Sequence, residues 1–334
     1  MRGILKVLVS MPSQRSPKSL ESFLKIAPEN VDFVILSEKK LEKKIEKTVE
    51  FNDEGIFKES WIFNRHTKRN FGFAYGYKQD YDVMITLDDD CFPLSENYFQ
   101  EHIERVSSTT NNFFNMLKLF SDVPSDVFEQ GARGHPKEIE NEYPVVVNQG
   151  LWHGDLDLWA STISNTLGSN DGKIPESLAN NCKVLQDFVI PKGQLTTVCG
   201  MNVAFLKEVT PAFAWSYQEP DGDLVARYDD IWSGLFVKVI LDKLDKRMNA
   251  GHPVILHDKG RRDITIDLKW EKNGDPINNF LWNNLPKLQL EGNDYASCYL
   301  EIAKWLEKPA EDPDKKFLKK VSKAMYEWID YLGC

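Results

Sequence analysis

The sequence predicts an α/β protein in which strands and helices alternate along the first hundred residues. Two apolar, β-branched segments, "ILKVLVSMP" at 4–12 and "VDFVILSE" at 31–38, are typical of strands, and the segment between them carries helix signals. A third strand is expected at "YDVMITL", residues 81–87, whose nearly continuous apolar content suits the centre of a parallel sheet. These observations favour a Rossmann-like sheet flanked by helices.

Two helices are expected in this half. The first begins in "SPKSLESFLKIAP", where Ser16 is a capping residue, Pro17 occupies the first helical position and Leu20 and Phe23 share one face. The second begins at Ser95 in "SENYFQEHIERV" and carries apolar residues at helical spacing. The charged stretch "EKKLEKKIEK" at 38–47 is typical of a solvated amphipathic helix.

Helices are also expected in the second half. A long helix is expected at 229–247, where a wide apolar stripe follows "YDD", and further helices are expected between 294 and 332, joined by the charged, proline-containing segment 307–316. We place a soft boundary near residue 250. It separates an α/β domain at 1–250 from a C-terminal, mainly helical extension at 251–334, and the alternative is a single domain.

Composition excludes several classes of protein. The chain has 334 residues, a formal net charge of -10 and a pI near 5.2, so it would repel a nucleic-acid backbone. No segment reaches the roughly 20 apolar residues that span a bilayer, and the N-terminal apolar run is too short for a signal peptide. The five cysteines are scattered and include no CxxC pair, which indicates reduced thiols in a cytoplasmic protein.

An acidic triplet follows the strand at 81–87. Asp88, Asp89 and Asp90 lie at its carboxyl end, where ligands bind in α/β sheets. Three adjacent carboxylates repel one another, and hard oxygen ligands suit Mg²⁺ or Mn²⁺ bridging to substrate phosphates. An Asp-x-Asp (DXD) motif at a strand end has this role in GT-A glycosyltransferases, where the metal holds a nucleotide-sugar diphosphate. The alternative is a loop whose aspartates cap the next turn.

A second acidic site occurs in "RYDDIWSG". Asp229 and Asp230 precede the predicted helix at 229–247, so they either cap it or serve as a base and a sugar-contacting carboxylate. Downstream, "HPVILHDKG" supplies His257, a candidate third metal ligand, and Lys259, a candidate UDP-sugar contact.

Cations are available for phosphates. "RHTKRNFGF" contains Arg65 and Arg69, which either bind a diphosphate or form a solvated basic turn. "GARGHP" places Arg133 in a loop rich in glycine and proline, where it would act as a phosphate or carboxylate clamp. Cys199 lies among turn glycines in "IPKGQLTTVCGMN" without a base beside it in sequence, which favours a packed small thiol.

Six collinear segments between about residues 5 and 305 resemble the reversibly glycosylated polypeptide family, whose plant members include UDP-arabinopyranose mutases: "DDDCFP", "ARGHP", "NQGLW", "IPKGQLTTVCGMNVAF", "RYDDIWSGLFVKVI" and "HDKG". The resemblance implies a GT-A-like fold, a UDP-sugar donor, Mn²⁺ or Mg²⁺, a homo-oligomer, and a cytosolic or Golgi-peripheral location. It also implies reversible self-glycosylation on an arginine, which matches Arg133, with Asp229 or Asp230 assisting as base.

One departure from the family concerns Glu140, which stands where plant mutases carry a second arginine. Loss of a cation near the diphosphate would weaken recapture of the sugar by UDP. The expected activity is therefore a self-glycosylating UDP-sugar mutase or autoglycosyltransferase. The alternatives are a conventional glycosyltransferase with a separate acceptor, and a non-catalytic UDP-sugar-binding subunit. The sequence does not identify the sugar, because pocket contacts worth a few kcal/mol decide between pentose and hexose.

Overall fold

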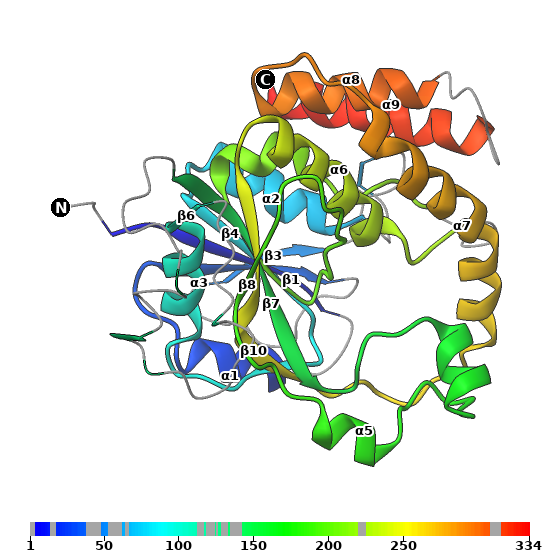
Figure 1. Cartoon of the computed structure of the whole chain (residues 1–334). Helices are drawn as coiled ribbons and strands as arrows, with labels where there is room; N and C mark the ends of the chain where they lie inside the picture. The colour runs from blue at the N-terminus through cyan, green and yellow to red at the C-terminus, as the bar shows by residue number, and fades with distance from the viewer. Residues whose placement is uncertain are drawn as a thin grey trace.

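The computed structural model describes residues 4–13, 18–37, 48–52, 62–63, 67–111, 117, 124, 126–127, 133, 142–219, 225–307 and 315–334. A large mixed sheet forms its centre (Figure 1). Its strands are hydrogen-bonded in the order β3-β2-β1-β4-β9-β7-β10-β5. Their bounds are β1 Val7–Ser13, β2 Val31–Ser37, β3 Thr48–Asn52, β4 Val83–Leu87, β5 Cys91–Pro93, β7 Tyr143–Gly154, β9 Asn202–Leu206 and β10 Arg247–His257.

Strand direction brings several carboxyl ends to one edge of the sheet. β1, β2, β3 and β4 are parallel, and β9 runs antiparallel to both β4 and β7. β7 therefore points the same way as β4, and β10 is parallel to β7. Two short strands lie off this path: β6, Thr109–Thr110, pairs with the start of β7, and β8, Phe188–Ile190, pairs with β10. Ligand sites form at such an edge.

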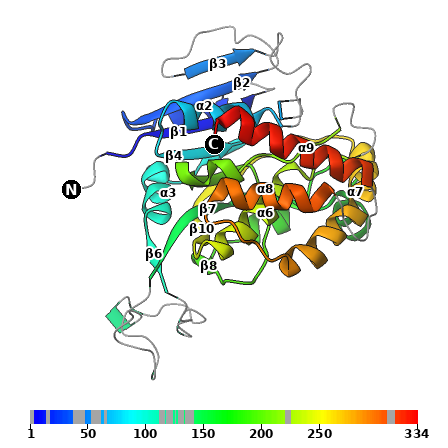
Figure 2. The same cartoon turned by 90° about the horizontal axis from the view of Figure 1, so that it is seen from above.

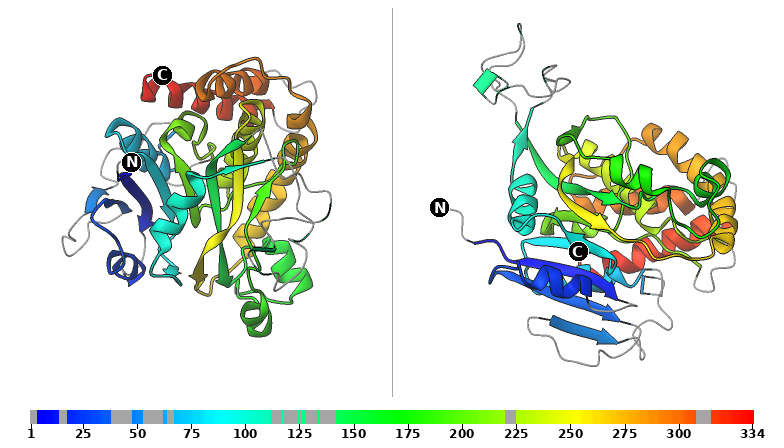
Figure 3. Two further views of the ribbon diagram at one scale, coloured as in Figure 1. Left: turned by 60° about the vertical axis from the view of Figure 1, so that its left-hand side comes forward. Right: turned by 90° about the horizontal axis from the view of Figure 1, so that it is seen from below.

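Helices cover both faces of the sheet (Figures 2 and 3). α1 and α3 pack on one face, where Phe23, Phe33 and Phe99 are buried together. α2, α6, α8 and α9 contribute to the larger core, which includes Phe205 of β9 and Trp328 of α9. The helix bounds are α1 Lys18–Leu24, α2 Arg69–Lys78, α3 Tyr98–Val106, α5 Glu176–Asn181, α6 Asp229–Lys243, α7 Thr265–Asn284, α8 Tyr295–Glu307 and α9 Lys315–Leu332.

The C-terminal helices are tied to the main sheet by large side chains. Trp328 is fully buried, and its indole Nε1 donates a hydrogen bond to the carbonyl oxygen of Thr210 at 3.2 Å. Truncation of such a tryptophan to alanine typically costs about 3–5 kcal/mol. α7 runs along one side of the molecule, between these helices and the segment that contains α5 (Figure 1).

The predicted α/β architecture with a helical C-terminal region is confirmed. The expected strands and helices of the first half are present, with ends shifted by a few residues, while 38–47 and the capping residues Ser16 and Pro17 lie outside the described part of the chain. The helix expected at 229–247 ends at Lys243, because β10 begins at Arg247. The expected division near residue 250 falls inside β10, and the larger core joins residues on both sides of it.

Candidate active site

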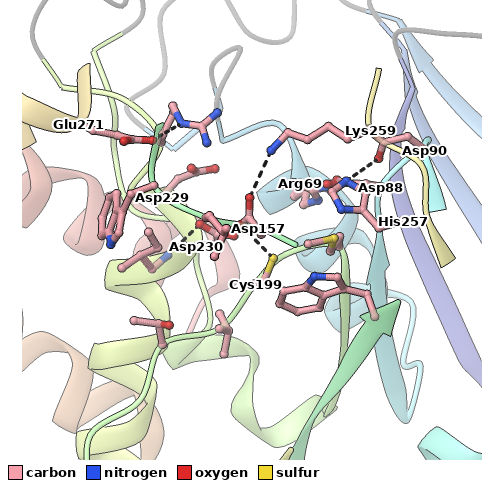
Figure 4. A pocket seen from close by; sticks show the side chains of 18 of the residues that line it. Arg69, Asp88, Asp90, Asp157, Cys199, Asp229, Asp230, His257, Lys259 and Glu271 are labelled. Carbon is pink, nitrogen blue, oxygen red and sulfur yellow. Dashed lines mark hydrogen bonds and ion pairs between the residues drawn. The ribbon is translucent and has the colours of Figure 1, made fainter. Parts of the chain in front are cut away.

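A cavity of about 900 Å³ lies at the carboxyl ends of the parallel strands (Figure 4). It is closed on one side by the start of α6 and by one face of α7. Its lining includes Pro12, Lys68, Arg69, Asp88, Asp89, Asp90, Trp152, Asp157, Leu158, Trp159, Thr197, Val198, Cys199, Met201, Arg227, Asp229, Asp230, Ile231, His257, Lys259, Arg262, Glu271, Asn278, Asn279 and Trp282.

The aspartate triplet is held in a turn between β4 and β5. The buried hydroxyl of Ser19, on α1, donates to the carbonyl oxygen of Cys91 at 2.5 Å, and the backbone amide of Asp258 donates to the carbonyl oxygen of Asp90 at 3.0 Å. β4 is buried along its whole length, so its end is fixed and the carboxylates that follow are directed into the cavity.

Asp90 faces His257 across this edge. The distance from Asp90 Oδ1 to His257 Nε2 is 3.8 Å. The other ring nitrogen of His257, Nδ1, lies 2.6 Å from the carbonyl oxygen of Asp155, which can only accept, so Nδ1 carries the proton. In a neutral ring the Nε2 lone pair then points toward the carboxylate. A backbone carbonyl fixing the far nitrogen in this way is the arrangement seen around metal-binding histidines.

Asp155 joins the ends of β7 and β10. Its amide donates to the carbonyl oxygen of His257 at 3.0 Å, and its Oδ2 accepts from the amide of Lys259 at 3.0 Å. Gly154 precedes it at φ +86°, and a Cβ there would lie 2.4 Å from the carbonyl oxygen of His257. A glycine is therefore required for the two strand ends to come this close.

Arg69 links the two acidic groups of the cavity. Its guanidinium forms an ion pair with Asp88 and donates to the carbonyl oxygen of Leu87 at 3.4 Å. Burial lowers the pKa of Arg69, and the nearby charges of Asp229 and Asp230 oppose that effect. The side chain is 12% exposed, so this positive charge lies inside the protein, between the β4 end and the α6 start.

Lys259 and Asp157 lie in the middle of the cavity (Figure 4). Lys259 Nζ is 3.5 Å from Asp157 Oδ1, and the Cys199 thiol donates to Asp157 Oδ2 at 3.5 Å. Partial removal from water would raise the pKa of Asp157, whose side chain is 38% exposed, but the charges of Lys259 and Arg227 hold it below its usual value. Burial lowers the pKa of Lys259. Asp157 is therefore an ionised carboxylate in the cavity.

Asp229 and Asp230 open α6 beside this pair. Asp230 Oδ2 accepts from the amide of Gly200 at 2.8 Å, and its Oδ1 accepts from the amide of Ile231 at 2.9 Å. Enclosure raises the pKa of Asp229 to about 6. The pKa of Asp230 rises to about 7, first because of its enclosure and then because of the charge of Asp229. Protons are therefore gained and lost here near neutral pH.

A network of arginines and carboxylates connects α7 to the cavity. Arg227 Nε donates to Glu271 Oε1 at 3.1 Å, and Arg227 Nη1 lies 3.3 Å from Asp267 Oδ2. The second oxygen of Glu271 accepts from the amide of Ala160 at 2.7 Å. Arg227 has φ +70°, an uncommon conformation for an arginine, which these contacts maintain.

The structure brings most of the predicted site residues into one cavity. Eight of them line it: Arg69, Asp88, Asp89, Asp90, Asp229, Asp230, His257 and Lys259. Arg65 and Glu140 lie outside the described residues. Arg133 is exposed and does not line the cavity. The β6–β7 pair, from which segment 111–142 departs and to which it returns, lies at the opposite end of β7 from the cavity-lining Trp152.

Several lining residues were not anticipated. Asp157 lies in "HGDLDLW", a segment for which neither an element nor a site is predicted, although the short-range repeat of aspartates is an available signal. Glu271 and Trp282 belong to α7, whose sequence contains Gly274 and Pro276. No local pattern marks these residues as part of a site.

The donor set suits a divalent cation. Within the described part of the chain, no three His, Cys, Asp or Glu side chains stand close enough to one point to hold a metal ion by themselves. The 3.8 Å between Asp90 Oδ1 and His257 Nε2 nevertheless lies within the span of two ligands bound to one ion at about 2.1 Å each. Mg²⁺ usually takes its remaining ligands from water and substrate phosphates. The residues present therefore fit such an ion together with a diphosphate.

None of the helices in the described residues has the length and apolar character needed to cross a membrane. None of the five cysteines forms a disulfide bond.

The family match and similar known proteins agree on one protein family. Residues 30–332 match the family described as reversibly glycosylated polypeptide. Over 278 residues the chain is 31% identical to probable UDP-arabinopyranose mutase 1 of Solanum tuberosum, covering 78% of this chain and 69% of that protein. It is 31% identical to UDP-arabinopyranose mutase 3 of Arabidopsis thaliana, covering 78% and 70%. It is 29% identical to UDP-arabinopyranose mutase 1 of Oryza sativa subsp. japonica, covering 78% and 70%.

Proposed function

Because this chain belongs to the reversibly glycosylated polypeptide family, we propose that it is a metal-dependent UDP-sugar mutase that carries the sugar transiently on Arg133. The observation that carries the proposal is the convergence of Asp88 and Asp90, His257 and Lys259 on one cavity from the ends of β4 and β10. The GT-A-like character of the fold is part of the same proposal.

The charges around the cavity support a requirement for a metal. Among the described residues that line it, seven are carboxylates and five are lysines or arginines, so the lining is negative at neutral pH when all are ionised. A UDP-sugar adds the negative charge of its diphosphate. Mn²⁺ or Mg²⁺ held by Asp90, His257 and Asp88 would offset this repulsion and, when bound, supply Lewis-acid stabilisation of the departing diphosphate.

The protein's own side chains have separate roles in this scheme. Arg69 orients Asp88 and neutralises part of its charge. Lys259, fixed through its amide by Asp155, directs a buried ammonium group toward the diphosphate. Asp230, whose pKa lies near neutrality, accepts the proton that a nucleophile loses on attacking the sugar. Asp89 contacts the nucleotide sugar beside them.

The sugar acceptor requires a further step, because Arg133 does not line the cavity. The family description and the match of "RGHP" support Arg133 as the glycosylated residue. A protonated guanidinium is a poor nucleophile, so reaction requires Arg133 to reach the anomeric carbon with a base beside it. The enzyme is proposed to act in the cytoplasm as a homo-oligomer.

Intact-protein mass spectrometry tests the proposal. The purified chain is incubated with Mn²⁺ and each of several UDP-pentoses and UDP-hexoses, and then with excess UDP. We expect a mass increment of one sugar that reverses with UDP, with ring-isomerised UDP-sugar in the supernatant. A new UDP-sugar without the protein increment would reject Arg133 as the carrier. Transfer only to an added acceptor would favour a conventional glycosyltransferase, and UDP-sugar binding without any product would favour a binding subunit.

A further inference from the structure

Two carboxylates in the middle of the cavity are held by consecutive residues. The thiol of Cys199 donates to Asp157 Oδ2 at 3.5 Å, and the amide of Gly200 donates to Asp230 Oδ2 at 2.8 Å. Because the two donors belong to adjacent residues and both aspartates line the same cavity, the two carboxyl groups face one region of it. Figure 4 shows Asp157 and Asp230 directed toward the same part of the cavity.

The Cys199–Gly200 turn is built to allow this approach. A Cβ at residue 200 would lie 2.8 Å from the ring of Trp215, 3.4 Å from the guanidinium of Arg69 and 3.5 Å from Asp230 Oδ2. The carbonyl oxygen of Gly200 accepts from the buried hydroxyl of Thr86 on β4 at 3.0 Å, which fixes the turn against the sheet. The backbone of this turn therefore fixes the contact to Asp230, while Asp157 is held through the side chain of Cys199.

Asp157 is also tied to the side chain that would hold the diphosphate. Lys259 Nζ is 3.5 Å from Asp157 Oδ1, and Lys259 lies two residues after His257. The bond that breaks in a UDP-sugar joins the diphosphate to the anomeric carbon. A carboxylate in contact with the lysine that is proposed to bind the diphosphate would therefore be near that carbon. Asp157 is 38% exposed to the cavity, so it can touch a ligand there.

From this geometry, and on the basis of the proposed function, we propose that Asp157 is a further catalytic residue whose carboxylate faces the anomeric carbon and stabilises its developing positive charge. When the bond from the anomeric carbon to the phosphate oxygen breaks, its electron pair leaves with UDP. A guanidinium nitrogen of the proposed carrier, Arg133, forms the new bond to that carbon and passes one proton to Asp230. Asp157 remains ionised throughout, and UDP reverses the same steps.

The surroundings of the two groups support this division of labour. The charges of Lys259 and Arg227 keep the pKa of Asp157 low despite its enclosure, whereas enclosure and the negative charges of Asp229 and Asp157 raise the pKa of Asp230, against the opposing charge of Arg69. Carboxyl groups whose environments separate their pKa values in this way commonly divide into a charge stabiliser and a proton carrier.

The first test compares Asp157→Asn with the matched variant Asp80→Asn, whose aspartate is exposed just after the end of α2 and forms an ion pair with Lys207. Loss of one preorganised electrostatic group typically lowers kcat by about 10²–10³-fold. We expect that loss for Asp157→Asn, with the Kd of UDP and Mn²⁺ changed by less than about threefold, and no change for Asp80→Asn. A weaker Kd for UDP with an unchanged kcat would reduce Asp157 to a partner of Lys259 and overturn the proposal.

A second test does not depend on turnover. A cationic iminosugar of pyranose size imitates the charge at the anomeric centre, and its binding is measured by calorimetry with UDP and Mn²⁺ present, beside a neutral sugar of the same shape. We expect the wild type to prefer the cation and Asp157→Asn to lose that preference by at least about tenfold. If the wild type binds UDP but binds both probes equally, the role of Asp157 is overturned and the proposed function is not. A chain that does not bind UDP with metal would overturn the proposed function as well.

Discussion

Asp90 Oδ1 and His257 Nε2 lie 3.8 Å apart at the carboxyl edge of the sheet, one from the turn after β4 and the other at the end of β10. They are 167 positions apart in sequence, and the pairing of Cys91 with His257 between β5 and β10 brings them together. Nδ1 of His257 donates a hydrogen bond to the carbonyl oxygen of Asp155, so Nε2 can serve as a ligand when the ring is neutral.

Replacement of Asp90 by alanine is expected to abolish UDP-sugar turnover, with a loss of at least about 10²-fold, because a ligand of the cation is removed. The variant should still bind UDP weakly through Lys259. Steady-state assays over a range of Mn²⁺ concentrations check this, with Asp80→Asn as the control. Full activity of Asp90→Ala would remove the metal assignment.

Replacement of His257 by alanine should lower the affinity for Mn²⁺ by about 10–100-fold, the usual effect of losing one ligand or its support. Titration of Mn²⁺ followed by electron paramagnetic resonance, with UDP present, measures this directly. Leu256→Ala provides a control on the same strand, since its side chain is 39% exposed and is not among the cavity-lining residues. Equal Mn²⁺ affinity in wild type and His257→Ala would contradict the role of the imidazole.

Asp230 should make stability fall as the pH rises. Its ordinary pKa is 3.8, and that of the folded protein is about 7, so the folded state binds more protons between these values. The free energy of unfolding therefore decreases across that window. Asp230→Asn should lose this slope, so that its Tm relative to the wild type rises by a few °C between pH 5 and 8. Asparagine has one acceptor oxygen, so the variant also loses one of the two amide hydrogen bonds from Gly200 and Ile231, an offset that does not depend on titration of residue 230 in the variant. Thermal melts at several pH values check this prediction. Equal slopes of Tm against pH in Asp230→Asn and in the wild type would refute the assignment.

Glu271→Ala should destabilise the fold by about 2–4 kcal/mol, because the amide of Ala160 loses its acceptor and Arg227 loses one of its two carboxylates inside the protein. Urea unfolding measures the loss, and Glu104→Ala on the exposed face of α3 is the control. An unfolding midpoint equal to that of the wild type would show that the α7 network does not stabilise the chain.

Arg133→Lys should remove the reversible sugar increment while leaving UDP affinity within about twofold, because Arg133 is exposed and outside the cavity lining. Peptide mapping after incubation with the UDP-sugar identifies the modified residue. An increment retained by Arg133→Lys would place the sugar on another side chain.

The order of the early strands and helices could be predicted because β4 and its neighbours follow short-range patterns of hydrophobicity. The same short-range patterns mark the triplet at 88–90, the pair at 229–230 and His257, because each of them ends or begins a regular element. α7 could not be predicted from such patterns, because Gly274 and Pro276 are poor helix formers. Gly274 is nevertheless suited to its position, where a Cβ would lie 2.1 Å from the ring of Tyr228.

Asp157 shows why part of the site needs three-dimensional information. Its role depends on Lys259 and Cys199, which lie 102 and 42 positions away in sequence, and no local spacing connects them. The antiparallel insertion of β9 between β4 and β7 brings these segments together, and the sequence contains no separate signal for that order.

The cavity at the carboxyl edge of the sheet is proposed to be a metal-dependent site for UDP-sugars. The most direct measurement is chromatographic separation of the UDP-sugars formed from UDP-pentoses and UDP-hexoses by the purified chain, with Mn²⁺ and with a chelator. We expect a ring-isomerised product that requires Mn²⁺ and is not formed by Asp90→Ala. Isomerisation that proceeds equally with the chelator and in Asp90→Ala would contradict it.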